Sequence, residues 1–431
     1  MTEALIGFLS FMALVAVARV PIGFAIGLVG FLGLGMMRSW NAAYASVIGE
    51  ITQVANYPLS VVPLFVLMGN LVTRGGLSRD LYQAANAFLG HRRGGLVAST
   101  IVASAGFGAV CGSSIATAAT MAKVALPEMQ RLGYKSGFAA ASVAAGGTLG
   151  ILIPPSSIMV IYGLMTETSI GALFAAGVLP GLIATLFYLL AAQWTVMRDA
   201  SAGPPGPRSD WRQRLMALRS VWTVLLLFAL VIGGLYSGYF TATEAAGIGA
   251  MGGFLVALAR RALTRQILSE VLVESAITSG MLFTILIGAQ IFSAFVNFTT
   301  MPTDLKSWIN GLGWDPIGVV VAICLVYIVL GCFMEAMSMI LLTVPVFFPL
   351  VTGLGFDPVW FGILLVCVVE IGLIHPPLGM NVFVIRATAS WIKGSEIWWG
   401  LVPFIVADFF RIAVLIAFPV ISLFLPKVLN L

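Results

Sequence analysis

The residues best suited to ligand binding form two small polar patches inside long apolar runs. The first patch combines glycines with hydroxyl side chains, at Gly106, Gly108, Gly112, Ser113, Ser114 and Thr117. The second combines a glycine with a carboxylate and a hydroxyl, at Gly331, Glu335 and Ser338. Glycine permits a left-handed backbone and close approach, while hydroxyls and bare carbonyls bind cations or carboxylates. The patches are therefore candidate ligand sites, with helix packing through small residues as the open alternative.

Two proline pairs follow these patches, at Pro154-Pro155 and Pro376-Pro377. Proline removes an amide donor and clashes with the carbonyl one turn back, so each pair is expected to break a helix and free several carbonyls. Freed carbonyls suit a dehydrated Na⁺, and the start of the next half-helix suits an anion. Polar neighbours of the breaks are Thr148, Ser156, Ser157, His375, Gly379 and Asn381. A kink used only for packing is the alternative.

Six ionisable residues lie within apolar segments: Glu244, Glu335, Glu370, His375, Asp408 and Arg411. Such residues are costly in a membrane and are candidates for function. Asp408 and Arg411 are three residues apart on one expected helix and should pair. Glu370 either acts in the site or pairs with a neighbouring helix. His375 either contacts the substrate or bonds to a backbone carbonyl.

The two patches and two proline pairs belong to an internal repeat. A shift of 222 residues aligns Pro127 with Pro349, Gly150 with Gly372, and the two proline pairs with each other. Leu132-Gly133 then aligns with Leu354-Gly355. Paired, interrupted hydrophobic segments in corresponding halves of a membrane protein indicate the binding site of a transporter.

Composition places the chain in a membrane. Of its 431 residues, 60% are hydrophobic and 9% are charged, with a mean hydropathy of +1.05. Soluble domains carry roughly 25% charged residues. We predict an all-α polytopic membrane protein with spans near 2–18, 21–37, 58–73, 138–164, 168–197, 221–239, 243–259, 276–297, 358–386 and 397–425. The segments 94–122 and 316–348 are predicted to be re-entrant helical hairpins, tolerated at membrane depth where protein or water covers them.

The loop charges fix an orientation for this layout. With the N-terminus outside and ten full crossings, 18 of the 22 Lys and Arg residues fall on the inner side. This distribution follows the positive-inside rule and explains the net charge of +5 without nucleic acid. The first hairpin then opens toward the cytoplasm and the second toward the outside, so the repeats are predicted to be inverted.

Three further segments have expected roles. Residues 77–90 and 303–311 are short and amphipathic, and we interpret them as interfacial arms, with ordinary loops as the alternative. The linker 199–219 is polar and is expected to be flexible. The four cysteines lack metal spacing, and the chain lacks HExxH, GxSxG and Walker A motifs, so neither a metal centre nor an enzyme is indicated.

The stretches GAVCGSSIATAATMAKVALPEM, GTLGILIPPSSIMVIYG, EAMSMILLTVPVFFPL and IGLIHPPLGMNVFVI resemble the large membrane subunit of tripartite ATP-independent periplasmic (TRAP) transporters, the DctM type. The resemblance covers nearly the whole chain. It implies an elevator fold in a bacterial inner membrane, where two hairpins and two broken helices form a mobile transport domain within a scaffold. It also implies two partners, a small four-helix membrane subunit and a periplasmic substrate-binding protein.

The resemblance further implies Na⁺-coupled uptake of a small organic acid, with each cation between a hairpin tip and its broken helix. The first cation would lie near Gly112, Ser113, Ser114, Gly150, Pro154 and Ser156. The second would lie near Gly331, Glu335, Ser338, Gly372, His375 and Pro377. The substrate would bind between them, with candidate contacts at Ser114, Thr117, Ser157, His375 and Asn381. Many members have threonine where this chain has His375, so the role of that hydroxyl does not carry over.

The expected division follows from this resemblance. Residues 1–75 form scaffold helices, 76–165 and 298–390 form the two transport repeats with their arms, 166–297 form scaffold helices with the linker, and 391–431 form a last scaffold helix. The alternatives are a sodium/anion symporter that acts alone, an intramembrane enzyme and a passive channel. The identity of the organic acid is not encoded in these motifs.

Overall fold

The computed structural model describes residues 2–54, 56–311, 313–332, 334–377 and 379–431, and this part of the chain is helical, with turns and without strands. Eight of its helical segments have the length and hydropathy to cross a membrane. Shorter apolar helices accompany them, among them Gly95–Cys111 and Pro316–Gly331 of the expected hairpins. The prediction of an all-α membrane protein is therefore confirmed.

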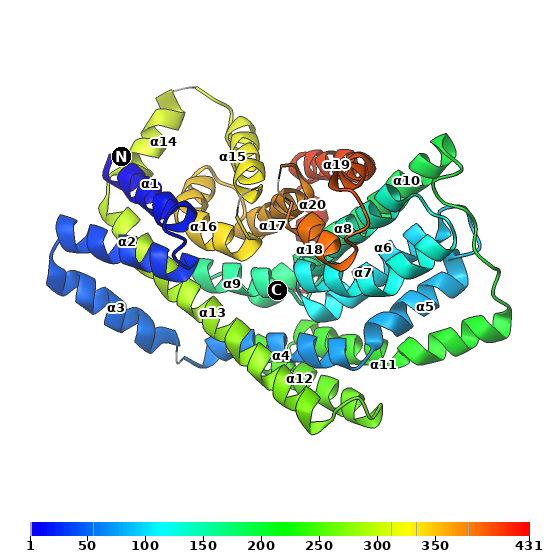
Figure 1. Cartoon of the computed structure of the whole chain (residues 1–431). Coiled ribbons are helices and arrows are strands. Elements are labelled where there is room, and N and C mark those ends of the chain that lie inside the picture. The colour runs from blue at the N-terminus through cyan, green and yellow to red at the C-terminus, as the bar shows by residue number, and fades with distance from the viewer. Residues whose placement is uncertain (1, 55, 312, 333, 378) are drawn as a thin grey trace.

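The first repeat is a helical hairpin followed by a broken helix (Figure 1). Helices α6 (Gly95–Cys111) and α7 (Ser114–Arg131) form the hairpin, and α8 (Ser136–Leu152) and α9 (Ser157–Thr166) form the broken helix. Gly112 turns the hairpin with φ of 64°, a left-handed conformation that favours glycine. Ser113 and Ser156 cap α7 and α9, since each side chain accepts a hydrogen bond from a backbone amide of the first turn.

The second repeat has the same order of elements. Helices α15 (Pro316–Gly331) and α16 (Ala336–Gly353) form its hairpin, and α17 (Pro358–Ile374) and α18 (Met380–Thr388) form its broken helix. Acidic caps begin three of these helices, at Asp315, Glu335 and Asp357. In Figure 1 the first hairpin reaches the centre from the right and the second from the left. Their insertion from opposite membrane faces remains a prediction.

The broken helices also join the two repeats to each other. Helix α9 packs against α16 of the second hairpin, and α18 packs against α7 of the first. The long halves α8 and α17 pack side by side. Because each short half crosses to the opposite hairpin, the two repeats form one unit with their tips near its middle.

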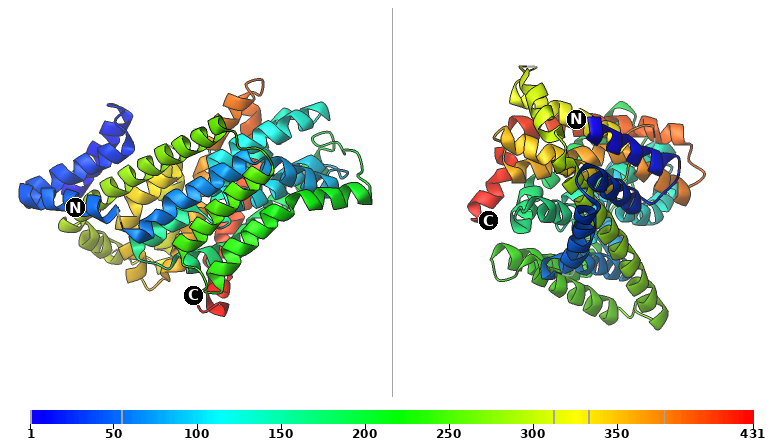
Figure 2. Two further views of the ribbon diagram at one scale, coloured as in Figure 1. Left: turned by 90° about the horizontal axis from the view of Figure 1, so that it is seen from below. Right: turned by 90° about the vertical axis from the view of Figure 1, so that its left-hand side faces the viewer.

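A second group of helices packs along one side of this unit. It contains α1 (Thr2–Ala16), α2 (Ile22–Met37), α4 (Val61–Arg74), α11 (Trp211–Tyr236), α12 (Ala242–Ala259) and α13 (Arg265–Phe298). Helix α13 packs against α2 and α4, and α12 packs against α4 and α11. The left view of Figure 2 shows α13, α4, α12 and α11 side by side as a slab. These helices are the candidates for the scaffold.

Two helices that the sequence placed in the scaffold pack elsewhere. Helices α10 (Ile170–Arg198) and α19 (Gly394–Ala417) pack against each other, and both contact α8 and α17. The C-terminal helix α20 (Val420–Val428) packs against α10. These contacts associate all three helices with the broken helices rather than with the slab.

The expected arms are helical, and the linker is more ordered than expected. Helix α5 (Leu77–Leu89) and helix α14 (Met301–Gly311) precede the two hairpins. Helix α11 begins within the predicted linker, because Asp210 and Gln213 form a capping box. The remaining linker bonds to the base of the first hairpin, where Gly94 N–H donates to Gly203 O at 2.8 Å and Gly206 N–H donates to Gly90 O at 2.9 Å.

Two other elements differ from the sequence prediction. Helix α3 (Trp40–Val54) lies between the expected spans 21–37 and 58–73, where no helix was predicted, and a 3₁₀ turn at Tyr57–Ser60 replaces the start of the second span. The polar residues Asn41, Glu50 and Gln53 lowered the apparent hydropathy of α3. The expected span 397–425 is divided between α19 and α20 near Pro419.

Candidate functional site

Each hairpin meets its own broken helix through glycine. A Cβ atom built on Gly108 would lie 2.4 Å from Gly150 Cα, and one built on Gly331 would lie 2.8 Å from Gly372 Cα. Real Cβ atoms do not approach backbone so closely, so each crossing depends on the absence of a side chain. The expected pairing of each hairpin with the break in its own repeat is present in the structure.

At the first break, the hairpin tip bonds to the start of α9. The Ser157 hydroxyl donates to Gly112 O at 3.0 Å, and a Cβ on Gly112 would lie 3.0 Å from Pro155 O. Ser113 O faces Gly150, where a Cβ would lie 2.9 Å away. Helix α8 ends before Pro154, so its last carbonyls lack the amides that a continuing helix would supply. Carbonyls and hydroxyls are ligands suited to Na⁺.

At the second break, a carboxylate takes the place of the serine. Glu335 caps α16, and its Oε2 accepts from Ser338 N–H at 3.1 Å and lies 3.4 Å from Ser338 Oγ. The Cys332 thiol lies 3.2 Å from Pro376 O. His375 follows the last turn of α17, where its Nδ1 is 2.7 Å from Pro376 O and 3.7 Å from Cys332 Sγ. The imidazole is therefore held beside the break through backbone and thiol.

A cavity of about 460 Å³ lies between the two hairpin tips and the scaffold. The tips contribute residues 112–116 and 335–337, and the first break contributes Pro155 and Ser157. The N-termini of α7, α9 and α16 reach this cavity together. The N-termini of α7 and α9 are capped by neutral serines, so their partial positive charge and remaining amides suit an anion. The start of α16 is already occupied by the Glu335 carboxylate.

The predicted substrate contacts divide into two sets. Ser114 and Ser157 line the cavity, whereas Thr117, His375 and Asn381 lie outside its lining. The Asn381 amide nitrogen donates to Ser114 Oγ at 2.9 Å and to Ala144 O at 3.0 Å. Thr117 Oγ1 donates to Ser113 O at 2.7 Å. In this conformation Asn381 and Thr117 therefore support the first tip from behind.

The scaffold contributes polar groups that sequence reasoning missed. Asn70 of α4 and Glu274 of α13 line the cavity opposite the tips. Asn70 Nδ2 donates to Ser275 Oγ at 2.9 Å, and Arg74 Nη2 lies 3.6 Å from Glu274 Oε2. Asn70 stands alone in an apolar span, and this isolation was a signal that could have identified it.

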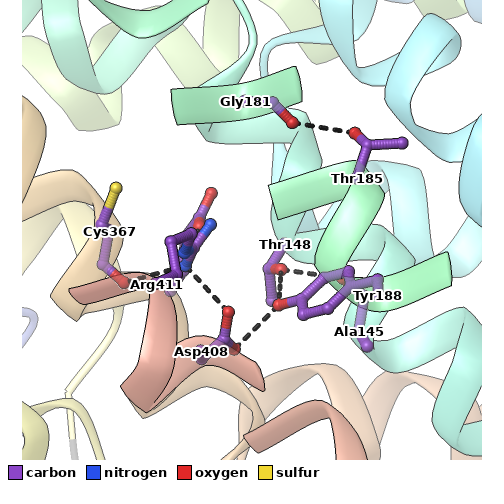
Figure 3. Close-up of polar contacts among 9 residues, drawn as sticks. Ala145, Thr148, Gly181, Thr185, Tyr188, Cys367, Asp408 and Arg411 are labelled. Carbon is purple, nitrogen blue, oxygen red and sulfur yellow. Dashed lines mark hydrogen bonds and ion pairs between the residues drawn. The ribbon is translucent and has the colours of Figure 1, made fainter. Parts of the chain in front are cut away.

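Behind the breaks lies a fully buried polar network, shown in part in Figure 3. Arg411 Nη2 lies 2.9 Å from Glu370 Oε2 and 3.0 Å from Asp408 Oδ1. Tyr188 donates to Asp408 Oδ2 at 2.8 Å, and its hydroxyl lies 3.1 Å from Thr148 Oγ1. The predicted pairing of Asp408 with Arg411 is confirmed, and Glu370 joins the same guanidinium. The contribution of Tyr188 has no signal in the sequence.

One other ionisable candidate has a structural role. Glu244 was expected within a membrane segment, but it lies in the first turn of α12. There its Oε2 accepts from Thr241 N–H at 2.8 Å, and Thr241 Oγ1 accepts from Glu244 N–H at 3.3 Å. Glu244 is thus half of a capping box rather than a member of the site.

Two repeated hairpins, two broken helices and one shared polar cavity are features of membrane transporters built from internal repeats. Comparison with a family of known sequences is consistent with this class. Residues 8–421 match the model of the DctM component of the tripartite ATP-independent periplasmic transporters. The chain belongs to this family.

Several relatives match along most of their length. The large permease protein DctM of a C4-dicarboxylate TRAP transporter from Pseudomonas aeruginosa is 39% identical over 87% of this chain and 88% of its own. The large permease protein SiaM of a sialic acid TRAP transporter from Vibrio cholerae is 31% identical over 95% of both chains. The large permease protein TeaC of an ectoine TRAP transporter from Halomonas elongata is 32% identical over 92% and 91%.

A solved structure shares the fold. The YdaH transporter of Alcanivorax borkumensis superposes with a TM-score of 0.63, covers 88% of each chain and is 17% identical. Together with the family match, these findings identify the chain as a large membrane permease component of a TRAP transporter and not an enzyme. The prediction of the family is confirmed, as is the membrane location.

Proposed function

We propose that this permease imports a small organic acid together with Na⁺, by an elevator movement of the hairpin unit along the slab. The observation that carries the proposal is the cavity of about 460 Å³ where the N-termini of α7 and α9 meet, beside the start of α16 that Glu335 caps. Those N-termini favour a carboxylate, while the glycine crossings and freed carbonyls beside them favour cations. Relatives named for C4-dicarboxylate and sialic acid support a carboxylate-bearing substrate.

The contacts also support a particular division between moving and fixed parts. Helices α10 and α19 pack with the broken helices, so we propose that they move with the hairpins. The arm α5 belongs to the fixed part, because Arg260 of α12 pairs with Asp80 and donates to Ser220 O of α11 at 2.9 Å. Arg214 of α11 also donates to Ala87 O at 3.1 Å.

We further propose that the permease works with a small membrane subunit and a periplasmic binding protein. The family is tripartite by name, and a relative from Oleidesulfovibrio alaskensis is a DctMQ permease of which this chain covers 60%. The binding protein would deliver the organic acid, and an isolated permease would then transport little. Transport by the permease alone would favour the symporter that needs no partner.

Uptake by proteoliposomes tests the coupling. Vesicles that contain the permease and small subunit, with binding protein outside, should accumulate the acid under an inward Na⁺ gradient. Replacement of Na⁺ by K⁺ should abolish accumulation, and uptake that persists would contradict the proposal. Ser113→Ala and Pro154→Ala should raise the Na⁺ concentration for half-maximal uptake several-fold. Ser237→Ala, at an exposed helix end, is the control.

A further inference from the structure

A small pocket lies on the scaffold away from the central cavity. Its volume is about 180 Å³, and its polar lining comes from Glu50, Gln53 and Asn56 on one side and Gln290 on the other. The lining residues belong to α3, the turn that follows it, α9 and α13. The central site described above does not use this pocket.

The internal repeat relates this pocket to the central cavity. The 222-residue shift maps Asn56 and Leu59 of the pocket onto Thr278 and Met281 of the cavity. The same shift maps Phe65 and Met68 of the cavity onto Ile287 and Gln290 of the pocket, so the four pairs are Asn56/Thr278, Leu59/Met281, Phe65/Ile287 and Met68/Gln290. These scaffold residues of the small pocket are thus the repeat equivalents of scaffold residues that line the central cavity.

The helices explain why this correspondence exists. Helix α13 is continuous from Arg265 to Phe298, and residues 43–76 are its equivalent in the first repeat. That first-repeat stretch comprises most of α3, the turn at Tyr57–Ser60 and α4. In an inverted repeat the two stretches run in opposite directions across the membrane. The part of α13 that lines the substrate site in the inward-facing state therefore has its repeat equivalent in residues 43–76 at the opposite membrane face. That equivalent part would line the substrate site in the outward-facing state.

We propose that the pocket of Gln53, Asn56 and Gln290 is the scaffold wall of the substrate site when the transporter faces outward. This inference rests on the proposed elevator function. The central cavity lies against the half of α13 that begins at Arg265, beside the C-terminal half of α4. Those ends carry the basic loops of the predicted cytoplasmic side, so this conformation faces inward. The side-chain amides at the opposite end would donate to the same organic acid.

The required movement fits the helix geometry. Thr278 and Gln290 are separated by 12 residues on one helix, which corresponds to a rise of about 18 Å. Gln290 also lines a neighbouring polar pocket with Ser293 and Asn297 of α13 and with Val344 and Phe348 of α16. The second hairpin already borders this level of the scaffold. Twelve residues also turn the helix by about 120°, so the hairpin tip would both rise along α13 and turn partly around it.

Thiol labelling from a defined side tests the proposal. Gln290→Cys and Asn56→Cys are introduced separately, and a membrane-impermeant maleimide is added from the periplasmic side with Na⁺ present. Both variants are made in a Cys111→Ala chain, which alone gives the background, because Cys111 is partly exposed and lines the central cavity whereas Cys324, Cys332 and Cys367 are buried. We expect labelling at least fivefold above background at both positions, and at least a tenfold loss of uptake after labelling.

Two control variants show from which side of the membrane labelling occurs and whether labelling by itself impairs uptake. Thr278→Cys should label only when the reagent reaches the cytoplasmic side. Ile277→Cys, at a residue that is 67% exposed and lies outside the cavity lining, should keep its uptake after labelling. Absence of periplasmic labelling at both test positions would overturn the inference, as would labelling that leaves uptake unchanged. Either result is separable from failure of the proposed function, which would appear as loss of Na⁺-driven uptake in the wild type.

Discussion

At equivalent positions, the first repeat carries hydroxyl groups where the second carries carboxylates. Ser113 and Glu335 are 222 residues apart, and each caps the second helix of its hairpin. Thr148 and Glu370 are also 222 residues apart, and both contribute to the buried network behind the breaks. The two repeats thus share the same order of helices and breaks, but only the second repeat carries acidic side chains at these two positions.

The two carboxylates of the second repeat have different surroundings. Glu335 lines the cavity and accepts from its own helix start, so its charge remains near the place where ligands would bind. Glu370 is fully buried and lies against the Arg411 guanidinium. The comparison indicates that one added charge is available to the site and the other holds α17 against α19.

The largest expected effect comes from removal of the shared guanidinium. Arg411→Met would leave Glu370 and Asp408 buried without their cation, and breaking a buried ion pair costs about 3–5 kcal/mol. We expect a strongly lowered unfolding midpoint in detergent, or loss of folded protein. The measurement is thermal unfolding followed by size-exclusion chromatography.

A compensated variant sharpens this prediction. Arg411→Met combined with Glu370→Gln and Asp408→Asn removes all three charges, and replacement of buried ion pairs by neutral groups is often tolerated. This triple variant should recover most of the lost stability. If the triple variant unfolds as readily as Arg411→Met, the network does not act through charge. Tyr188→Phe removes one donor and should have a smaller effect.

The glycine crossings provide a second comparison between repeats. A Cβ on Gly372 would lie 2.5 Å from Gly331 Cα and 2.8 Å from Gly331 C, so both obstacles are backbone. A Cβ on Gly150 would meet the Thr117 hydroxyl at 2.6 Å and Ser113 O at 2.9 Å. Overpacking costs about 1–3 kcal/mol. We expect Gly372→Ala to reduce uptake more than Gly150→Ala, measured with equal amounts of folded protein.

The side chain at the first crossing allows a specific rescue. Thr117→Ala removes the hydroxyl that the methyl group added by Gly150→Ala would meet, so the double variant should recover part of the uptake. No side-chain change offers the same relief at Gly372, because its neighbour is the backbone of Gly331. Equal loss in both glycine variants, without rescue, would contradict this account of the crossings.

Some features of the fold and the candidate site could be predicted from the sequence, and others could not. Composition and loop charge determined the membrane class, and the order of patches and proline pairs determined the hairpins and breaks. The packing of α10 and α19 against the broken helices was not predicted, because the sequence of an apolar helix does not show which helices it packs against. Tyr188 was missed for the same reason, since its partner Asp408 lies 220 residues away. The roles of the predicted Na⁺ ligands remain predictions.

The smallest expected effect lies at the base of the first hairpin, where the linker contacts one repeat on the predicted cytoplasmic side. The Lys135 ammonium forms an ion pair with Asp199, and this bond, with help from Ser201, lowers the Asp199 pKa from 3.8 to about 2. A carboxyl whose pKa is lowered by folding stabilises the fold above its unfolded pKa. That contribution is lost as the pH falls from 3.8 through about 2.

Asp199→Asn should therefore change the unfolding midpoint little, and by the same amount at pH 8 as at pH 5, because Asp199 stays ionised throughout this range. Both side chains are largely exposed, so solvent and salt screen the pair. The backbone bonds from Gly94 and Gly206 would still hold the linker to the hairpin. A midpoint that differs between wild type and variant at pH 8 but not at pH 5 would mean that Asp199 titrates near neutrality. The linker would then hold the first repeat through charge rather than through its backbone.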